Sequence, residues 1–120
     1  MENKTRQFAL TRLSTLLEIP ETDTICINLE KCILNYATDR SNDLGQEPAW
    51  DNYRFSDIYK QKFLQIQHNL RNSPVLRGWL VNKKIKTKDV MDMRNKIISD
   101  LEMHLAEGKP AESFIEKYKI

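Results

Sequence analysis

The sequence predicts an all-α fold, a small helical bundle of about five or six helices. Only three glycines and four prolines interrupt the 120 residues, and such sparse punctuation is typical of helical proteins. Each periodic segment repeats its apolar residues at intervals of three and four, which is the spacing of one helix face. The length, with 40% hydrophobic and 30% charged residues, fits a single domain that spans residues 1–120.

The first two helices are predicted on either side of Pro20. An apolar stripe runs from Thr5 to Ile19, and Pro20 disfavours helical geometry in the residue before it. The next helix is expected to start within residues 22–24, whose side chains can cap free amides, and to run to about Thr38. The residues expected to face inward on these helices are Phe8, Ala9, Leu13, Leu16, Leu17, Ile25, Leu29, Cys32, Ile33, Tyr36 and Ala37.

A long loop and the most regular helix are predicted next. The chain from Asp39 to Arg54 is polar and without period, so we expect a loop whose end is anchored by Trp50 and Tyr53. A helix should then open at residue 55 or 56. Its inward residues are expected to be Phe55, Ile58, Tyr59, Phe63, Ile66 and Leu70.

A fourth, shorter helix is predicted at Ser73-Pro74. Serine is a good helix cap, and proline is tolerated at the first helical position because its missing amide proton would have no partner there. This helix should bury Leu76, Trp79 and Leu80, and residues 82–86 should form a connector.

A fifth helix is predicted to begin at Thr87, which can cap it, and to end at Gly108. A last short turn should begin at Pro110. The residues expected to face inward in this part of the chain are Val90, Met93, Ile97, Leu101, Leu105, Phe114, Ile115 and Tyr118.

Charge is distributed unevenly along the chain. From Arg54 to Lys96 there are eleven basic residues and three acidic ones, whereas the remainder holds eight basic and fourteen acidic residues. The overall charge of +2 therefore conceals a basic middle. Such a segment indicates either a polyanionic or acidic partner or a solvated helix surface, and charge alone does not separate the two.

Several kinds of function are disfavoured by the residues present. Two cysteines and two distant histidines do not make a zinc site, and no glycine-rich phosphate loop occurs. Neither His68 nor His104 has the spacing of a catalytic group beside a nucleophile. We therefore expect a binding module without catalytic residues, metal or cofactor. No apolar stretch is long enough to cross a membrane, and the first residues lack a secretory pattern, so we expect an intracellular protein.

An ordered series of short motifs carries a family resemblance. The motifs are Arg6, Leu13–Leu17, Leu29-Glu30-Lys31-Cys32-Ile33, Tyr59-Lys60, Asn69-Leu70, Asn72-Ser73-Pro74-Val75-Leu76-Arg77, Ile85 and Val90-Met91-Asp92-Met93. In this order and spacing they resemble the central domain of transcription elongation factor S-II (TFIIS), over residues 5–93. Residues 33–37, with Trp50 and Phe55 ahead of residues 58–60, are similar to the divergent S-II-like proteins of large DNA viruses.

The chain also departs from the S-II pattern. Lys84 and Thr87 replace a glycine and a proline of the family, and the family pattern does not continue into the helical extension at residues 94–120. The zinc ribbon of the family, with four cysteines and an acidic Asp-Glu hairpin, has no counterpart in a chain with two cysteines and no Asp-Glu pair. A fragment from which the ribbon was removed is a further interpretation, although the amphipathic tail argues against it.

The resemblance implies docking without transcript cleavage. In that family the central domain lies on the largest subunit of a multisubunit DNA-dependent RNA polymerase, and a basic helix makes much of the contact. We therefore expect a non-enzymatic elongation factor, accessory subunit or competitor of S-II, located in the nucleus, at a viral transcription site or in the virion. The alternative is a basic nucleic-acid-binding or packaging protein; no membrane partner is expected. The residues expected to make the contact are Arg71, Arg77, Lys83, Lys84, Lys86 and Lys88.

Overall fold

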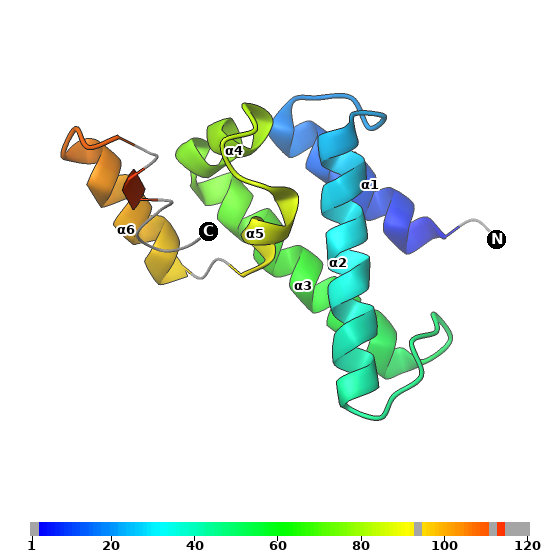
Figure 1. Ribbon diagram of the computed structural model, residues 1–120. Helices are drawn as coiled ribbons and strands as arrows, with labels where there is room; N and C mark the ends of the chain where they lie inside the picture. Colours follow the sequence, from blue (N-terminus) through cyan, green and yellow to red (C-terminus); the bar gives the residue numbers. More distant parts are fainter. Residues whose placement is uncertain (1–2, 93–94, 111–112, 115–120) are drawn as a thin grey trace.

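The computed structural model describes residues 3–92, 95–110 and 113–114, and for residues 95–97 it describes the backbone only. The described residues form an all-α fold, which confirms the predicted class (Figure 1). The helices are α1 (Lys4–Leu17), α2 (Thr24–Asp43), α3 (Tyr53–Asn72), α4 (Pro74–Val81), α5 (Thr87–Met91) and α6 (Asn95–Ala106).

Helices α1, α2 and α3 form the main packing unit, and each contacts the other two. Their inward stripes meet in one apolar core, in which several side chains have no exposed surface. Burial of each large apolar side chain contributes about 1.5–3 kcal/mol, so this unit contains most of the apolar stabilisation. The fully buried aliphatic side chains here include Leu13, Leu29, Ile33, Ile66 and Leu70.

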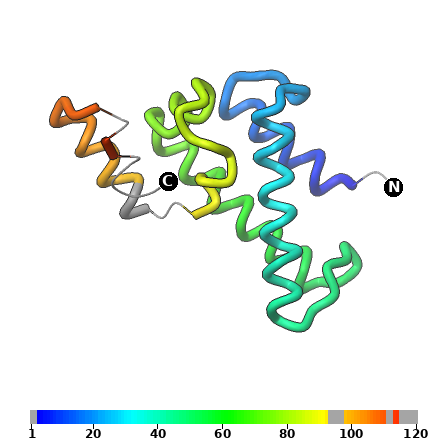
Figure 2. The backbone as a smooth tube through the Cα atoms, viewed as in Figure 1, coloured from blue at the N-terminus to red at the C-terminus, as the bar shows by residue number. Residues whose placement is uncertain are grey.

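Helices α4 to α6 extend this unit to one side. The side chain of Ser73 accepts a hydrogen bond from the Leu76 amide, as the predicted cap requires, and the chain turns into α4. Trp79 on α4 packs edge-on against Phe114, with 6.5 Å between ring centroids. Helix α6 lies beyond α4, on the side away from α1 and α2 (Figures 1 and 2).

The first two predicted helices differ from the observed ones at their ends. Helix α1 stops at Leu17 rather than Ile19, because Glu18 adopts a left-handed conformation with φ of 55°. Helix α2 continues to Asp43 rather than Thr38. Exposed polar side chains do not break a helix, and Gly45, with φ of 70°, is the first residue after Thr38 with a positive φ.

The predicted loop is therefore shorter than expected, and only residues 44–52 lie between α2 and α3. Helix α3 starts at Tyr53 because the Asn52 side chain accepts a hydrogen bond from the Arg54 amide at 3.1 Å. Trp50 anchors the loop as predicted, with its ring 4.9 Å from Phe55. The prediction for Tyr53 is wrong, since 79% of this residue is exposed on the outer face of the first turn.

The predicted fifth helix is two helices rather than one. Helix α5 ends at Met91, and α6 begins at Asn95 and ends two residues before Gly108. The Lys62 ammonium donates a hydrogen bond of 2.6 Å to the Met91 carbonyl, so the end of α5 is satisfied without further helix. Lys86, not Thr87, occupies the cap position. Phe114 is buried as predicted; the side chains of Met93, Ile97, Ile115 and Tyr118 lie outside the described residues.

Two aromatic residues of the predicted inward stripes are exposed. Phe8 on α1 is 55% exposed and Tyr36 on α2 is 39% exposed. Each lies at the edge of its stripe, where a neighbouring side chain covers one side of the ring. Phe8 contacts the edge of Phe63, and the Lys62 ammonium lies 4.3 Å from the centre of the Tyr36 ring.

Candidate basic groove between α2 and the α4–α5 segment

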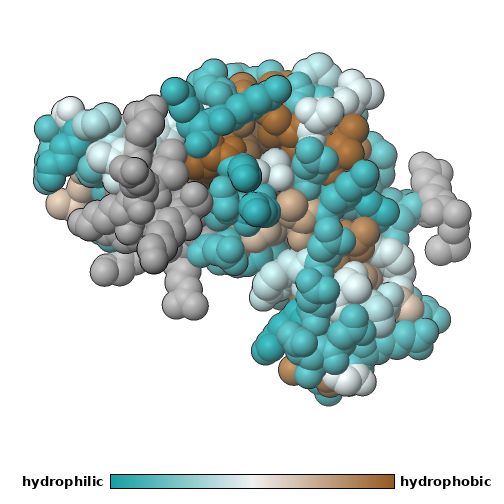
Figure 3. All heavy atoms as spheres, in the orientation of Figure 1, coloured by the Kyte–Doolittle hydropathy of each residue, from teal (hydrophilic) through white to brown (hydrophobic). Residues whose placement is uncertain are grey.

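A groove of about 670 Å³ separates the outer face of α2 from the segment that joins α4 to α5. We call it the basic groove. Its floor is apolar and appears as the brown area between these segments in Figure 3, with teal side chains at its edges. The residues that line it are Thr24, Ile25, Asn28, Lys31, Cys32, Asn35, Leu80, Lys83, Ile85, Lys86, Thr87 and Lys88.

One wall of the basic groove is a polar stripe on α2. Thr24, Asn28, Lys31 and Asn35 recur at intervals of four, three and four residues, which places them on one face of the helix. The opposite face of α2 carries the apolar core residues. Because α2 turns that apolar face inward, the neighbouring Glu30 and Ile33 are buried and Lys31 points away from the core.

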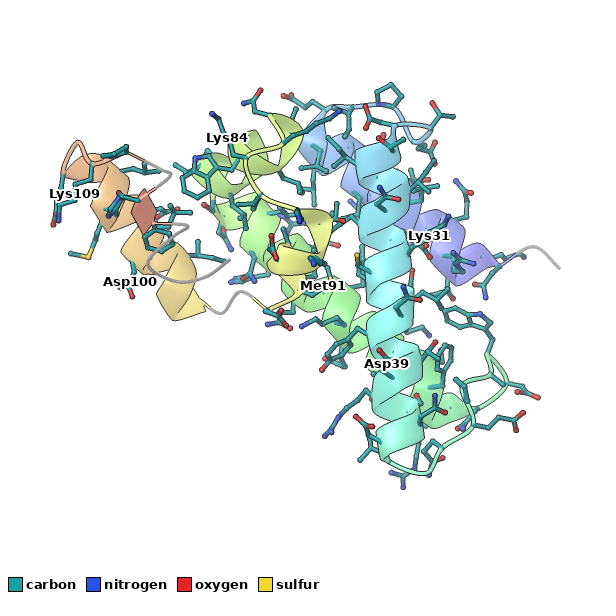
Figure 4. All side chains as sticks on the ribbon, viewed as in Figure 1. Lys31, Asp39, Lys84, Met91, Asp100 and Lys109 are labelled. Atoms are coloured by element: carbon teal, nitrogen blue, oxygen red, sulfur yellow. The ribbon has the colours of Figure 1, made fainter. Side chains whose placement is uncertain are left out.

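The other wall is the short segment between α4 and α5. Ile85 is 6% exposed and fixes the middle of this segment against the core. The backbone turns at Lys83, whose φ is 60°, and the Lys84 amide donates to the Trp79 carbonyl at 2.8 Å. Asp89 accepts a hydrogen bond from the Lys86 amide. These bonds hold the lysines of the segment opposite α2. Figure 4 labels Lys31 on α2 and Lys84 on the α4–α5 side.

The four lysines of the groove are exposed, and no carboxylate lines the groove among the described residues. Lys31, Lys83, Lys86 and Lys88 form no ion pair with any residue that the structure describes. Cations that converge on a concave surface produce a positive potential there, because the low-dielectric walls concentrate the field. The groove is therefore suited to carboxylate or phosphate groups, and its floor to an apolar side chain beside them.

Of the six residues predicted to bind a partner, three line the basic groove, namely Lys83, Lys86 and Lys88. Lys84 is exposed on the same segment but is not part of the lining. Arg71 is exposed at the end of α3. The Arg77 guanidinium donates to the carbonyls of Leu70 and Arg71, at 2.7 and 2.9 Å, so it stabilises the end of α3.

Lys31, Asn28 and Asn35 were not among the predicted residues. The sequence pattern that could have identified them is the recurrence of polar residues on the face of α2 opposite its apolar stripe. The charge count does not reach them, because the basic stretch begins at Arg54, after the end of α2. Only the packing of α5 against α2 brings Lys31 to the lysines that follow α4.

A partly buried polar cluster fixes α2 in place behind the groove. Arg6 on α1 donates to both carboxylate oxygens of Glu30 on α2, at 2.6 and 2.8 Å. The Tyr59 hydroxyl on α3 donates to Glu30 at 3.1 Å. The hydrogen bond to Glu30 raises the pKa of Arg6, and burial together with the Glu30 charge raises the pKa of Tyr59. The cluster joins the three long helices at one point.

Both cysteines are free thiols. Cys26 is fully buried, and burial raises its pKa to about 11, which makes it a poor nucleophile. Cys32 is half-buried in the basic groove, with its sulfur 3.6 Å from the Thr87 hydroxyl. Among the described residues, no three His, Cys, Asp or Glu side chains are grouped so that they could hold a metal ion.

Comparisons of the chain with protein-family models, with curated proteins and with solved structures find no match. Within the described part of the chain, no helix is long and apolar enough to span a membrane.

Proposed function

We propose that this chain is a non-enzymatic docking module, similar to the central domain of S-II, that binds a multisubunit DNA-dependent RNA polymerase through the basic groove. The observation that carries the proposal is the convergence of four lysines, from α2 and from the α4–α5 segment, on a groove that no carboxylate lines in the described part of the chain. Such a groove is complementary to an acidic segment on the surface of a large protein. The polymerase itself, and hence a location at the site of transcription, is inferred from the resemblance.

The placement of the resembling residues supports this proposal. Arg6, Glu30 and Tyr59 belong to three separate motifs, and they form one hydrogen-bonded cluster. Three motif residues far apart in the sequence therefore have a shared structural role. Ser73 and Arg77, from a fourth motif, form the cap of α4 and the end of α3.

The surroundings of the histidines favour a binding role over a catalytic one. The ring nitrogens of His68 lie 3.1 and 3.2 Å from the Asn72 amide nitrogen, on the outer face of α3. The Nε2 atom of His104 lies 2.8 Å from the Pro110 carbonyl and 3.0 Å from the Ser113 hydroxyl. Neither ring is aligned with a cysteine, since no such contact occurs among the described residues.

An acidic protein segment fits the basic groove better than a nucleic acid does. Lysine, not arginine, supplies every positive charge in its lining, whereas arginine is the usual residue for bidentate phosphate and base contacts. Single-strand binding proteins stack bases on exposed aromatic rings. Here Tyr59, Phe63 and Trp79 are buried, and no aromatic residue lines the groove.

The test reverses the charge of the basic groove and compares it with a matched reversal elsewhere. The groove variant is Lys31→Glu/Lys86→Glu/Lys88→Glu. The control is Arg40→Glu/Arg54→Glu/Lys109→Glu, whose three sites are exposed and lie outside the groove. Both variants change the net charge equally. We expect affinity capture from the native source, with mass spectrometry, to recover the largest polymerase subunit with the wild type and the control but not with the groove variant.

Nucleic-acid binding is measured in parallel by fluorescence anisotropy with labelled DNA and RNA over a range of salt concentrations. Tight binding of the wild type to either, with steep salt dependence and no polymerase recovered, contradicts the proposal and supports the packaging alternative. Equal polymerase recovery with the groove variant contradicts the basic groove as the docking surface. Circular dichroism of both variants checks that the helices are intact.

A further inference from the structure

A second groove lies between α1 and α3, and its lining is mainly apolar. Its volume is about 380 Å³, and two of its side chains, Phe8 and Leu64, are 55% and 52% exposed. We call it the apolar groove. Exposed apolar side chains that gather around a concavity between two helices mark a site for a partner more often than scattered ones do. The residues that line it are Lys4, Thr5, Phe8, Ala9, Tyr59, Lys60, Phe63 and Leu64.

The apolar groove is held in shape by contacts beneath it. The Phe8 ring meets the edge of the Phe63 ring, with 6.1 Å between centroids, and the Arg12 guanidinium lies 5.3 Å from the centre of the Phe8 ring. Tyr59 lines the groove while its hydroxyl is bonded to Glu30 below. Because these contacts already fix the lining, a partner would lose little conformational entropy from the groove when it binds.

Among the described residues, the charged side chains that line the apolar groove are positive. Helix α1 contains no acidic residue, and two of its three cations, Lys4 and Arg12, lie at the groove and over Phe8. Lys60 on α3 lines the other side. Asp57, the only carboxylate of α3, lines a different pocket, together with Tyr36 and Arg40.

We propose that the apolar groove binds an amphipathic helical segment of a partner protein, with large apolar side chains on one face and carboxylates along the edges of that face. Phe8 and Leu64 would contact the apolar face. Lys4, Arg12 and Lys60 would lie beside the carboxylates. A helix bound in a groove between two helices is a common form of protein recognition, and the charge around this groove selects the acidic kind.

Two other occupants fit less well. A second copy of the chain, bound through the same groove about a two-fold axis, would place the cations Lys4, Arg12 and Lys60 on both sides of the interface, and like charges oppose such a contact. A nucleic acid needs polar groups to bind its base edges. The lining offers carbon surface with the lysines at its margin, and Arg12 already covers the Phe8 ring.

This inference goes beyond the polymerase proposal. The basic groove is formed by α2 and the α4–α5 segment, the apolar groove by α1 and α3, and no residue lines both. The two sites can therefore be occupied together, and the chain would link an acidic surface to the acidic helix of a second protein.

The probe is a synthetic, fluorescently labelled helix of about 15 residues, with leucines at i and i+4 and glutamates beside them. A matched probe replaces each glutamate by glutamine. We expect the variant Phe8→Gln/Leu64→Gln to weaken binding of the glutamate probe by about ten-fold or more. The control Met103→Gln changes a residue on α6 that is 63% exposed and should leave binding unchanged. The basic-groove variant Lys31→Glu/Lys86→Glu/Lys88→Glu should also leave it unchanged. The glutamine probe should bind more weakly, and added salt should affect only the glutamate probe.

Several results would overturn the assignment. They are no binding of the glutamate probe, equal binding by Phe8→Gln/Leu64→Gln, or equal binding of the two probes. If only the basic-groove variant Lys31→Glu/Lys86→Glu/Lys88→Glu lost binding of the probe, the probe would bind in the basic groove. Self-association in analytical ultracentrifugation that Leu64→Gln abolishes would identify a second copy as the occupant, and single-stranded DNA binding that Phe8→Gln abolishes would identify a nucleic acid. Polymerase capture uses a different variant, so failure of one proposal is distinct from failure of the other.

Discussion

The contacts that join helices α1, α2 and α3 are contacts between side chains. Fully buried residues such as Leu13, Leu29 and Ile66 meet in the core, and the bonds of Arg6 and Tyr59 to Glu30 connect the same three helices. The joints that involve α4 and α5 also bury apolar side chains, such as Leu76 and Val90, but they have a second component. There a cation on one element binds the backbone at the end of another. Lys62 donates to the last carbonyl of α5, and Arg77 on α4 donates to carbonyls at the end of α3.

This difference reduces the number of cations in residues 54–96 that are available to bind a partner. Lys62 is only 8% exposed, and Arg77 is bonded to two carbonyls. Two of the eleven cations between residues 54 and 96 are therefore part of the fold. A count of charge along the sequence overstates the charge available to a partner protein, because carbonyls at helix ends bind some of the cations.

The largest expected effect lies in the three-helix unit. Ile66→Ala should lower the free energy of unfolding by about 2–5 kcal/mol, because the fully buried side chain would leave a cavity among its neighbours. Leu64→Ala, two residues away and 52% exposed, should cost less than about 1 kcal/mol. Urea titration measures both. Similar losses at the two positions would mean that the inward face of α3 is assigned wrongly.

The polar cluster of the same unit should give a smaller effect. Glu30→Gln keeps the size of the side chain but removes its charge, so Arg6 loses a charged partner, and we expect a loss of about 1–3 kcal/mol. Tyr59→Phe removes the other bond to Glu30. Because both changes act on one cluster, their combined cost should differ from the sum of the separate costs. Strict additivity in urea titrations would show that the cluster is not coupled.

The elements of this fold could be predicted from the sequence because each long helix has its own apolar period. The ends could not be predicted as well. Polar residues such as Arg40 and Asn42 are equally compatible with a loop and with an exposed helix, and they are exposed and helical here. The break after Met91 depends on Lys62, 29 residues earlier, so no local pattern could reveal it.

The basic groove was only partly predictable for a similar reason. The lysines at 83, 86 and 88 lie close together in sequence, so they could be found by counting charge. Lys31 joins them only because α5 packs against α2. The apolar groove could not be predicted, since the helical period placed Phe8 in the core, and its exposure depends on how far α1 and α3 overlap.

The smallest expected effect lies at the joint between α3 and α5. Lys62→Met keeps the apolar stem but removes the hydrogen bonds to the Met91 carbonyl and to Gln65. A charged hydrogen bond stabilises, but burial of the ammonium opposes it, so we expect a net loss of about 1 kcal/mol at neutral pH. Lys60→Met, at an exposed site on the same helix, is the control and should cost less.

The pH dependence of this loss tests its cause. Burial lowers the pKa of Lys62 in the folded state, below the usual value of 10.5. As the pH rises through the folded pKa, the folded protein releases this proton before the unfolded chain does, so the wild type gains stability relative to Lys62→Met until the pH passes 10.5. Groups that titrate in both proteins cancel in the difference. Urea titrations of the pair from neutral to alkaline pH measure it, and a difference that shrinks as the pH rises would show that burial is not what controls the Lys62 ammonium.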